Sequence, residues 1–173
     1  MRVNSIAQLG LYLLIAVIPC YAQTRTPGFD AYTIEPAFPR HSARVQINSG
    51  PDTRCFRTML RATVRSGQRF AGHYAILNWG CGTECTRIGI VDLRTGKAYV
   101  SPFGIGIINL QVRPNSKLMI ANSPEWIQAT YGDAPPDYIS TQYYIWDGAR
   151  LRKVANGRVG TEPEREFEPC SAL

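Results

Sequence analysis

The sequence predicts an α+β fold: an antiparallel sheet of about five to seven strands, one main amphipathic helix and long loops. Residues 53–66 (TRCFRTMLRATVRS) carry apolar side chains at helical spacing. Asp147-Gly148 is a strong two-residue hairpin signal between two β-rich segments. Strand-type patterns occur at residues 73–79, 87–93, 98–100, 117–121, 142–146 and 151–154. Consecutive hairpins with a helix packed on one sheet face are typical of this fold class.

The helix expected at residues 53–66 has two different faces. Asp52 or Thr53 can cap its start, and Gly67 can end it. One face is apolar and is formed by Phe56, Met59, Leu60 and Thr63. The opposite face is a stripe of Arg54, Arg57, Arg61 and Arg65. We interpret this stripe as a solvated helix face, although an anion is the alternative partner for four arginines.

The N-terminal residues have the three parts of a signal peptide. Arg2 precedes an apolar run of ten residues (9–18, LGLYLLIAVI), and a small-x-small cleavage site ends at Ala22. A helix needs about 20 apolar residues to cross a bilayer, so we expect cleavage after Ala22 and no permanent membrane anchor. A lipoprotein modified at Cys20 is the alternative, which Pro19 disfavours. The mature chain is therefore expected in the periplasm or as a secreted protein.

Composition divides the chain into four parts. Residues 1–22 are the expected signal peptide, and residues 23–52, rich in Pro, Gly, Thr and Ser, are an irregular arm with one short strand at 43–47. Residues 53–160 form a single α+β domain. Residues 161–173 are an acidic C-terminal tail.

The body of the chain is strongly basic. The net charge is +6, and the tail holds four of the thirteen acidic residues, so residues 23–160 carry 17 basic and 9 acidic side chains. A basic exported body favours an anionic cell-wall component or an envelope or exported protein as partner, with solubility as the simpler explanation. No nucleic-acid motif occurs, so nucleic acid is not expected as a partner.

Four cysteines remain after export: Cys55, Cys81, Cys85 and Cys170. An even number in an exported chain indicates disulfides, with three possible pairings. Only three residues separate Cys81 from Cys85 across a hairpin tip, which suits the geometry of a bridge. We therefore predict the pairs Cys81–Cys85 and Cys55–Cys170.

The densest motif is FAGHYAILNWGCGTEC at residues 70–85. A thiolate nucleophile would need His73 beside Cys81, which lie about 26 Å apart on an extended strand at ~3.3 Å per residue. A metal site or a redox dithiol would also use these cysteines, but thiols in an oxidising compartment usually pair. We interpret the segment as a structural disulfide and expect no metal and no cofactor. Metalloprotease, nucleophile-elbow and phosphate-loop signatures are missing from the sequence.

Four motifs in order resemble a family of small exported bacterial proteins. They are FAGHY, WGCGxxC, D-x-x-TGKVY (here with Lys97-Ala98-Tyr99) and a late Y-x-W-D-G, which is Tyr144 to Gly148. The match covers roughly residues 56–154 with fitting spacing. The family has no assigned activity, so the resemblance implies an exported bacterial protein and indicates no substrate.

The leading hypothesis is a non-catalytic binding protein, an inhibitor or immunity-type factor in one version, with an unknown partner. The expected contact surface combines residues 72–85 with a long loop at 123–140, because glycines there indicate special backbone geometry and aromatic residues dominate protein contacts. The expected binding residues are His73, Tyr74, Trp79, Trp126, Tyr131 and Tyr138. The alternative is a cell-envelope enzyme that uses His73 with Asn78 or Asp92.

Overall fold

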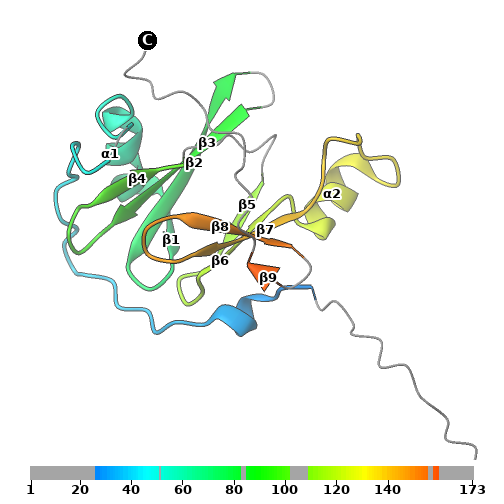
Figure 1. The fold of residues 1–173 in the computed structure, drawn as a ribbon, viewed down its shortest axis with the longest axis horizontal. Helices are drawn as coiled ribbons and strands as arrows, with labels where there is room; N and C mark the ends of the chain where they lie inside the picture. Colours follow the sequence, from blue (N-terminus) through cyan, green and yellow to red (C-terminus); the bar gives the residue numbers. More distant parts are fainter. Residues whose placement is uncertain (1–25, 51, 83–84, 102–108, 156–157, 160–173) are drawn as a thin grey trace, which may run out of the picture.

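The computed structural model describes residues 26–50, 52–82, 85–101, 109–155 and 158–159. The chain forms two antiparallel sheets, each a meander of strands in sequence order (Figure 1). The first sheet contains β1 (Gln68–Phe70), β2 (Tyr74–Gly82), β3 (Cys85–Asp92) and β4 (Ala98–Val100). The second contains β5 (Leu110–Val112), β6 (Leu118–Ala121), β7 (Gln142–Trp146), β8 (Leu151–Ala155) and β9 (Arg158–Val159).

The predicted α+β class is confirmed, but the strands form two sheets where one was predicted. Each predicted hairpin forms, with β2 paired to β3, β3 to β4 and β7 to β8. Turn chemistry specifies such neighbouring pairs, whereas it does not specify whether two meanders join edge to edge or stack. The short strands β1, β5 and β9 were not predicted, because no strand-type pattern was recognised in their residues.

Helix α1 (Arg57–Ser66) and the second sheet cover opposite faces of the first sheet. Leu60 of α1 packs with Val91 and Ala98 on one face. On the other face, Ile88 and Ile90 join a larger core with residues of the second sheet, among them Met119, Tyr144, Trp146 and Leu151. Because side chains alternate along a strand, β3 supplies both contacts. The order of layers is helix, sheet, sheet.

Helix α1 starts later than residue 53, because both predicted caps have other partners. The Thr53 hydroxyl lies 2.6 Å from the Ile47 carbonyl oxygen and 2.8 Å from that of Gly50. The Asp52 carboxylate accepts a hydrogen bond from Arg87 at 3.1 Å. Residues 52–56 therefore form turns, and Phe56 precedes the helix without a side-chain cap. The end of the helix at Gly67 is as predicted.

The N-terminal arm packs along both sheets instead of standing apart from the domain. Ile34 N–H donates to the Asn115 carbonyl at 2.9 Å beside the second sheet, and Ala43 N–H donates to Leu93 at 2.9 Å beside the first. The strand expected at residues 43–47 is reduced to one bridge between Gln46 and Lys97. The arm therefore joins the two sheets.

The loop expected at 123–140 contains helix α2 (Pro124–Tyr131), so that prediction is wrong over these eight residues. The Ser123 hydroxyl accepts a hydrogen bond from the Trp126 N–H at 3.2 Å, and Pro124 occupies the first turn. Ser-Pro-Glu is a helix-start pattern, so the signal was present in the sequence. Gly132 follows the helix with φ of 64°.

The turn after β7 spans residues 147–150 and is longer than the predicted two-residue loop. Trp146 pairs with Leu151, and Asp147 N–H donates to the Arg150 carbonyl at 3.2 Å. The Asp147 carboxylate accepts from the N–H groups of Ala149 and Arg150, both at 2.9 Å. Gly148 has φ of 97°, a conformation that suits glycine.

The predicted disulfide pairs remain predictions. Cys55 and Cys81 are both disulfide-bonded. The strand register places Cys85 opposite Gly82, next to Cys81. The side chain of Cys85 and the whole of Cys170 lie outside the described residues, as do the expected signal peptide (1–22) and the acidic tail. Within the described ranges, no helix is long and apolar enough to cross a membrane.

Candidate functional site

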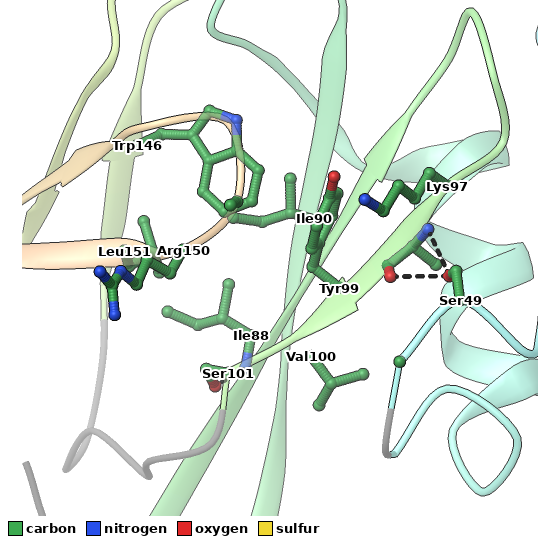
Figure 2. Close-up of a pocket in the computed structure, with 13 residues that line it drawn as sticks. Ser49, Ile88, Ile90, Lys97, Tyr99, Val100, Ser101, Trp146, Arg150 and Leu151 are labelled. Carbon is green, nitrogen blue, oxygen red and sulfur yellow. Dashed lines mark hydrogen bonds between the residues drawn. The ribbon is translucent and has the colours of Figure 1, made fainter.

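A cavity of about 330 Å³ opens between the two sheets beside β4. Figure 2 shows Trp146 and Leu151 of the second sheet on one side and Ile90 and Tyr99 of the first sheet facing them, with Ile88 between. Ligand pockets in proteins start at about 300 Å³, so the space suits a small molecule or a single side chain.

The walls of the cavity are set by the alternation of side chains in β3 and β4. Ile90 pairs with Tyr99 across the two strands, and Ile88 is two residues away, so all three point to the same face. Ile88 and Ile90 are buried, at 0 % and 2 % exposure. Ile88 and Ile90 therefore form a buried floor, while the exposed residues Lys97 and Arg150 border the open rim of the cavity.

Trp146 anchors the opposite wall. Its ring meets Tyr99 at 5.0 Å and Tyr74 at 5.3 Å between ring centres, both in edge-to-face geometry. Such aromatic pairs contribute about 0.5–1.5 kcal/mol each beyond the area they bury. Burial also raises the pKa of the Tyr74 hydroxyl, which stays neutral. The aromatic wall is therefore fixed before any ligand arrives.

Side chains with hydroxyl groups hold β4 in place at the cavity. The Ser101 hydroxyl accepts a hydrogen bond from the Ile88 N–H at 3.1 Å. The Ser49 hydroxyl lies 2.9 Å from the Ala98 nitrogen and 2.8 Å from the Ala98 oxygen, as the dashed lines in Figure 2 show. Ser49 therefore pairs with the backbone N–H and C=O groups of Ala98 on the outer edge of β4, where a further strand would otherwise bind.

Two cationic side chains border the cavity. Lys97 comes from the β3–β4 turn, and its ammonium nitrogen lies 5.3 Å from the centre of the Tyr99 ring. Arg150 comes from the β7–β8 turn, and its side chain is 66 % exposed. Among the described residues that line the cavity, none is an aspartate or glutamate.

The nearest carboxylate on the β7–β8 turn, Asp147, has two arginine partners. Its Oδ2 lies 2.6 Å from Arg152 Nε and 3.7 Å from Arg150 Nε. Burial acts to raise the pKa of Asp147, but hydrogen bonds from Arg152 and from two backbone N–H groups outweigh it, so the pKa lies below its usual value. One carboxylate shared by two arginines leaves this turn with a net positive charge.

His73 lies outside this cavity and contacts a single carboxylate. Its Nε2 is 3.8 Å from Asp92 Oδ1, and its ring stacks on Tyr74 at 4.4 Å. Burial lowers the pKa of His73, Asp92 acts against this and Arg94 adds to it. The Thr95 hydroxyl donates a hydrogen bond to Asp92 Oδ2 at 2.8 Å. Its proton is therefore held by the carboxylate, and the His73 imidazole does not activate this hydroxyl as a nucleophile. Asn78 is five residues further along the chain, and its place on extended β2 keeps it from joining this group.

Trp79 is half-buried beneath α1. Its ring centre lies 5.3 Å from that of Phe56, and Gly89 leaves the space that the ring fills. Tyr74 is partly buried and packs against the main core beside Trp146. Both aromatic residues therefore contribute to packing in this structure.

The two segments expected to form one contact surface are spread along the molecule. His73 and the disulfide-bonded Cys81 lie at opposite ends of β2. Helix α2 projects on the other side of the molecule from α1 (Figure 1). On α2, Trp126 meets Tyr131 edge to face at 5.8 Å, and Tyr138 beyond the helix is 59 % exposed.

Sequence reasoning missed the cavity although it had quoted the segments that form it. Lys97 and Tyr99 belong to the third motif given for the family resemblance, and Trp146 belongs to the fourth. The structure brings these two motifs together on facing walls. Each motif combines an aromatic residue with a turn that carries a basic residue, and this shared combination was the signal in the sequence that could have indicated the cavity.

No family model, curated protein or solved structure matches the chain. Within the described residues, no group of three or more His, Cys, Asp or Glu side chains is arranged to hold a metal ion. The resemblance to small exported bacterial proteins stays an expectation from the motifs.

Proposed function

We propose that the chain is an exported, non-catalytic binding protein that takes its ligand into the cavity between the two sheets. The observation that carries the proposal is the cavity itself, an opening of about 330 Å³ with apolar and aromatic walls between the two sheets. A concave opening lined mainly by apolar and aromatic side chains, with a few polar groups, is typical of small-molecule binding sites.

The rigidity of the walls supports a binding role. Trp146 is held between Tyr74 and Tyr99, and the Ser49 and Ser101 hydroxyls, which accept hydrogen bonds from the Ala98 and Ile88 N–H groups, fix β4. A ligand that enters a preformed site does not have to order these side chains, which lowers the entropic cost of binding.

A neutral apolar probe and a substitution that fills the cavity test this proposal. Ala149 lines the cavity on an exposed turn, so Ala149→Phe places a ring in it with little effect on the core. Ala134 is exposed in the segment after α2 and does not line the cavity, so Ala134→Phe is the matched control.

Titration with N-phenyl-1-naphthylamine, followed by its fluorescence, gives the affinity of each variant. We expect saturable one-to-one binding by the wild-type protein and by Ala134→Phe, and an affinity reduced by about tenfold or more in Ala149→Phe, equivalent to about 1.4 kcal/mol. The proposal fails if the wild-type protein does not bind the probe or if Ala149→Phe binds it equally well.

The export part of the proposal is supported by the signal-peptide pattern of the N-terminal residues. Intact mass of the protein recovered from its own producer should correspond to a chain that starts at Gln23. A mass that retains Met1, or a lipid on Cys20, would contradict it.

A further inference from the structure

We propose that the ligand of this cavity is an amphipathic anion: an apolar body that carries one carboxylate, sulfonate or phosphate group. The inference rests on the proposed function and names the chemical class that the cavity selects. The body lies between the sheets, and the charged group stays at the mouth near Lys97 and Arg150.

The charges around the mouth favour an anion. Lys97 and Arg150 come from two different turns, one on each sheet, and both line the cavity. Asp147, the carboxylate nearest to Arg150, is held at 2.6 Å by Arg152 and so neutralises only part of the local charge. Figure 2 draws the two side chains on opposite sides of the cavity, so a ligand carboxylate at either rim lies beside a positive charge.

The walls require that the anion carry an apolar body. Ile88, Ile90, Leu151 and the Trp146 ring present hydrocarbon surface, and burial of apolar ligand surface is worth about 25 cal/mol per Å². A bare inorganic anion would lose its hydration there without gaining hydrogen bonds from the walls.

The aromatic wall does not favour a cationic ligand. The face of a tyrosine ring attracts cations, but the Lys97 ammonium already lies 5.3 Å from the centre of the Tyr99 ring. A ligand ammonium placed there would be repelled by Lys97. Lys97 thus occupies the face of the Tyr99 ring and also supplies positive charge at the mouth of the cavity.

A matched pair of fluorescent probes tests the charge preference. 8-Anilinonaphthalene-1-sulfonate has the same aromatic skeleton as N-phenyl-1-naphthylamine and adds one sulfonate. At low ionic strength we expect the wild-type protein to bind the sulfonate about tenfold more tightly, because two cations act on it. Lys97→Met and Arg150→Met should each weaken sulfonate binding about three- to fivefold more than they weaken binding of the neutral probe.

Exposed cations away from the cavity serve as controls. Lys117→Met and Arg65→Met remove exposed charges from residues that do not line the cavity, and both should leave the affinity for either probe unchanged. Equal affinity of the wild-type protein for both probes, or no effect of Lys97→Met and Arg150→Met, overturns the anion inference while the binding function stands. Absence of binding by both probes overturns the binding function itself.

Competition identifies the source of the anion. Decanoate should displace the sulfonate probe, and decanol, with the same chain and no charge, should displace it at least about fivefold less well. Displacement by phosphatidylglycerol vesicles but not by decanoate assigns the same chemistry to a membrane lipid. Equal displacement by decanoate and decanol contradicts the proposal.

Discussion

The two faces of the first sheet are covered in different ways. On the face under α1, Leu60 and Val91 are each 0 % exposed, and the Trp79 ring lies so close to Gly89 that a methyl group there would meet it at 2.7 Å. On the face toward the second sheet, Met119 and Tyr144 are buried, at 0 % and 1 % exposure, but the contact opens beside β4 into the cavity. A helix follows the surface of a sheet closely, whereas two twisted sheets diverge at their corners. The comparison separates a contact that provides stability from one that leaves room for a ligand.

The largest effect should come from breaking the buried ion pair on the closed side. Arg87 donates to Asp52 at 3.1 Å and to the Ser101 carbonyl at 2.9 Å, and both charged side chains are less than one-tenth exposed. Arg87→Met leaves Asp52 buried without this partner and should lower the free energy of unfolding by about 3–5 kcal/mol in urea titrations. Arg57→Met, on the exposed face of α1, is the control and should change it little. A loss below about 1 kcal/mol would show that this pair does not hold the closed side.

The same leucine truncation on the two sides tests the comparison directly. Leu60→Ala removes a fully buried side chain under α1 and should cost about 2–5 kcal/mol. Leu151→Ala removes a side chain that already borders the cavity, so we expect a cost nearer the lower end of the same range. Thermal unfolding of both variants measures the difference. Equal costs, or a larger cost for Leu151→Ala, would mean that the two contacts are packed alike.

Gly89 reports how closely the helix side is packed. Gly89→Ala places a carbon 2.7 Å from the Trp79 ring and 3.1 Å from Leu60, and such overpacking costs about 1–3 kcal/mol. Gly80→Ala is the matched control on β2, because its new carbon meets nothing within 4 Å. Tryptophan fluorescence during urea unfolding gives both values. Equal stability of the two variants would place Trp79 away from Gly89.

The smallest effect concerns the turn beside the cavity. The folded pKa of Asp147 lies below its unfolded value of 3.8, so its stabilising effect is present above about pH 4 and is lost as the pH falls through the lower folded value. Asp147→Asn should therefore cost about 1 kcal/mol at pH 7 and progressively less below pH 4. Unfolding curves from pH 7 to pH 2 measure this difference, and a gap that stays constant with pH would contradict it.

Much of the local structure was predictable because it depends on neighbouring residues. The strand at residues 87–93, the turn with Gly96 at φ of 79° and the end of α1 at Gly67 all follow from the local sequence. Helix α2 was also encoded locally by Ser123 and Pro124, but its residues were interpreted as part of a loop.

The stacking of the sheets and the cavity could not be predicted in this way. Both depend on how two meanders, far apart in sequence, meet and diverge. Lys97 and Arg150 are ordinary turn residues until the structure places both at one opening. The packing of Trp79 against Phe56 also depends on where α1 crosses the sheet.

Methyl-resolved NMR of the protein titrated with decanoate tests the central claim most directly. If the opening between the sheets is the binding site, the methyl signals of Ile88 and Ile90 will shift with a common saturable affinity, while those of Leu60 and Val64 under α1 will not move. Shifts confined to the α1 side, or no shift of Ile88 and Ile90, would contradict the assignment of function to this cavity.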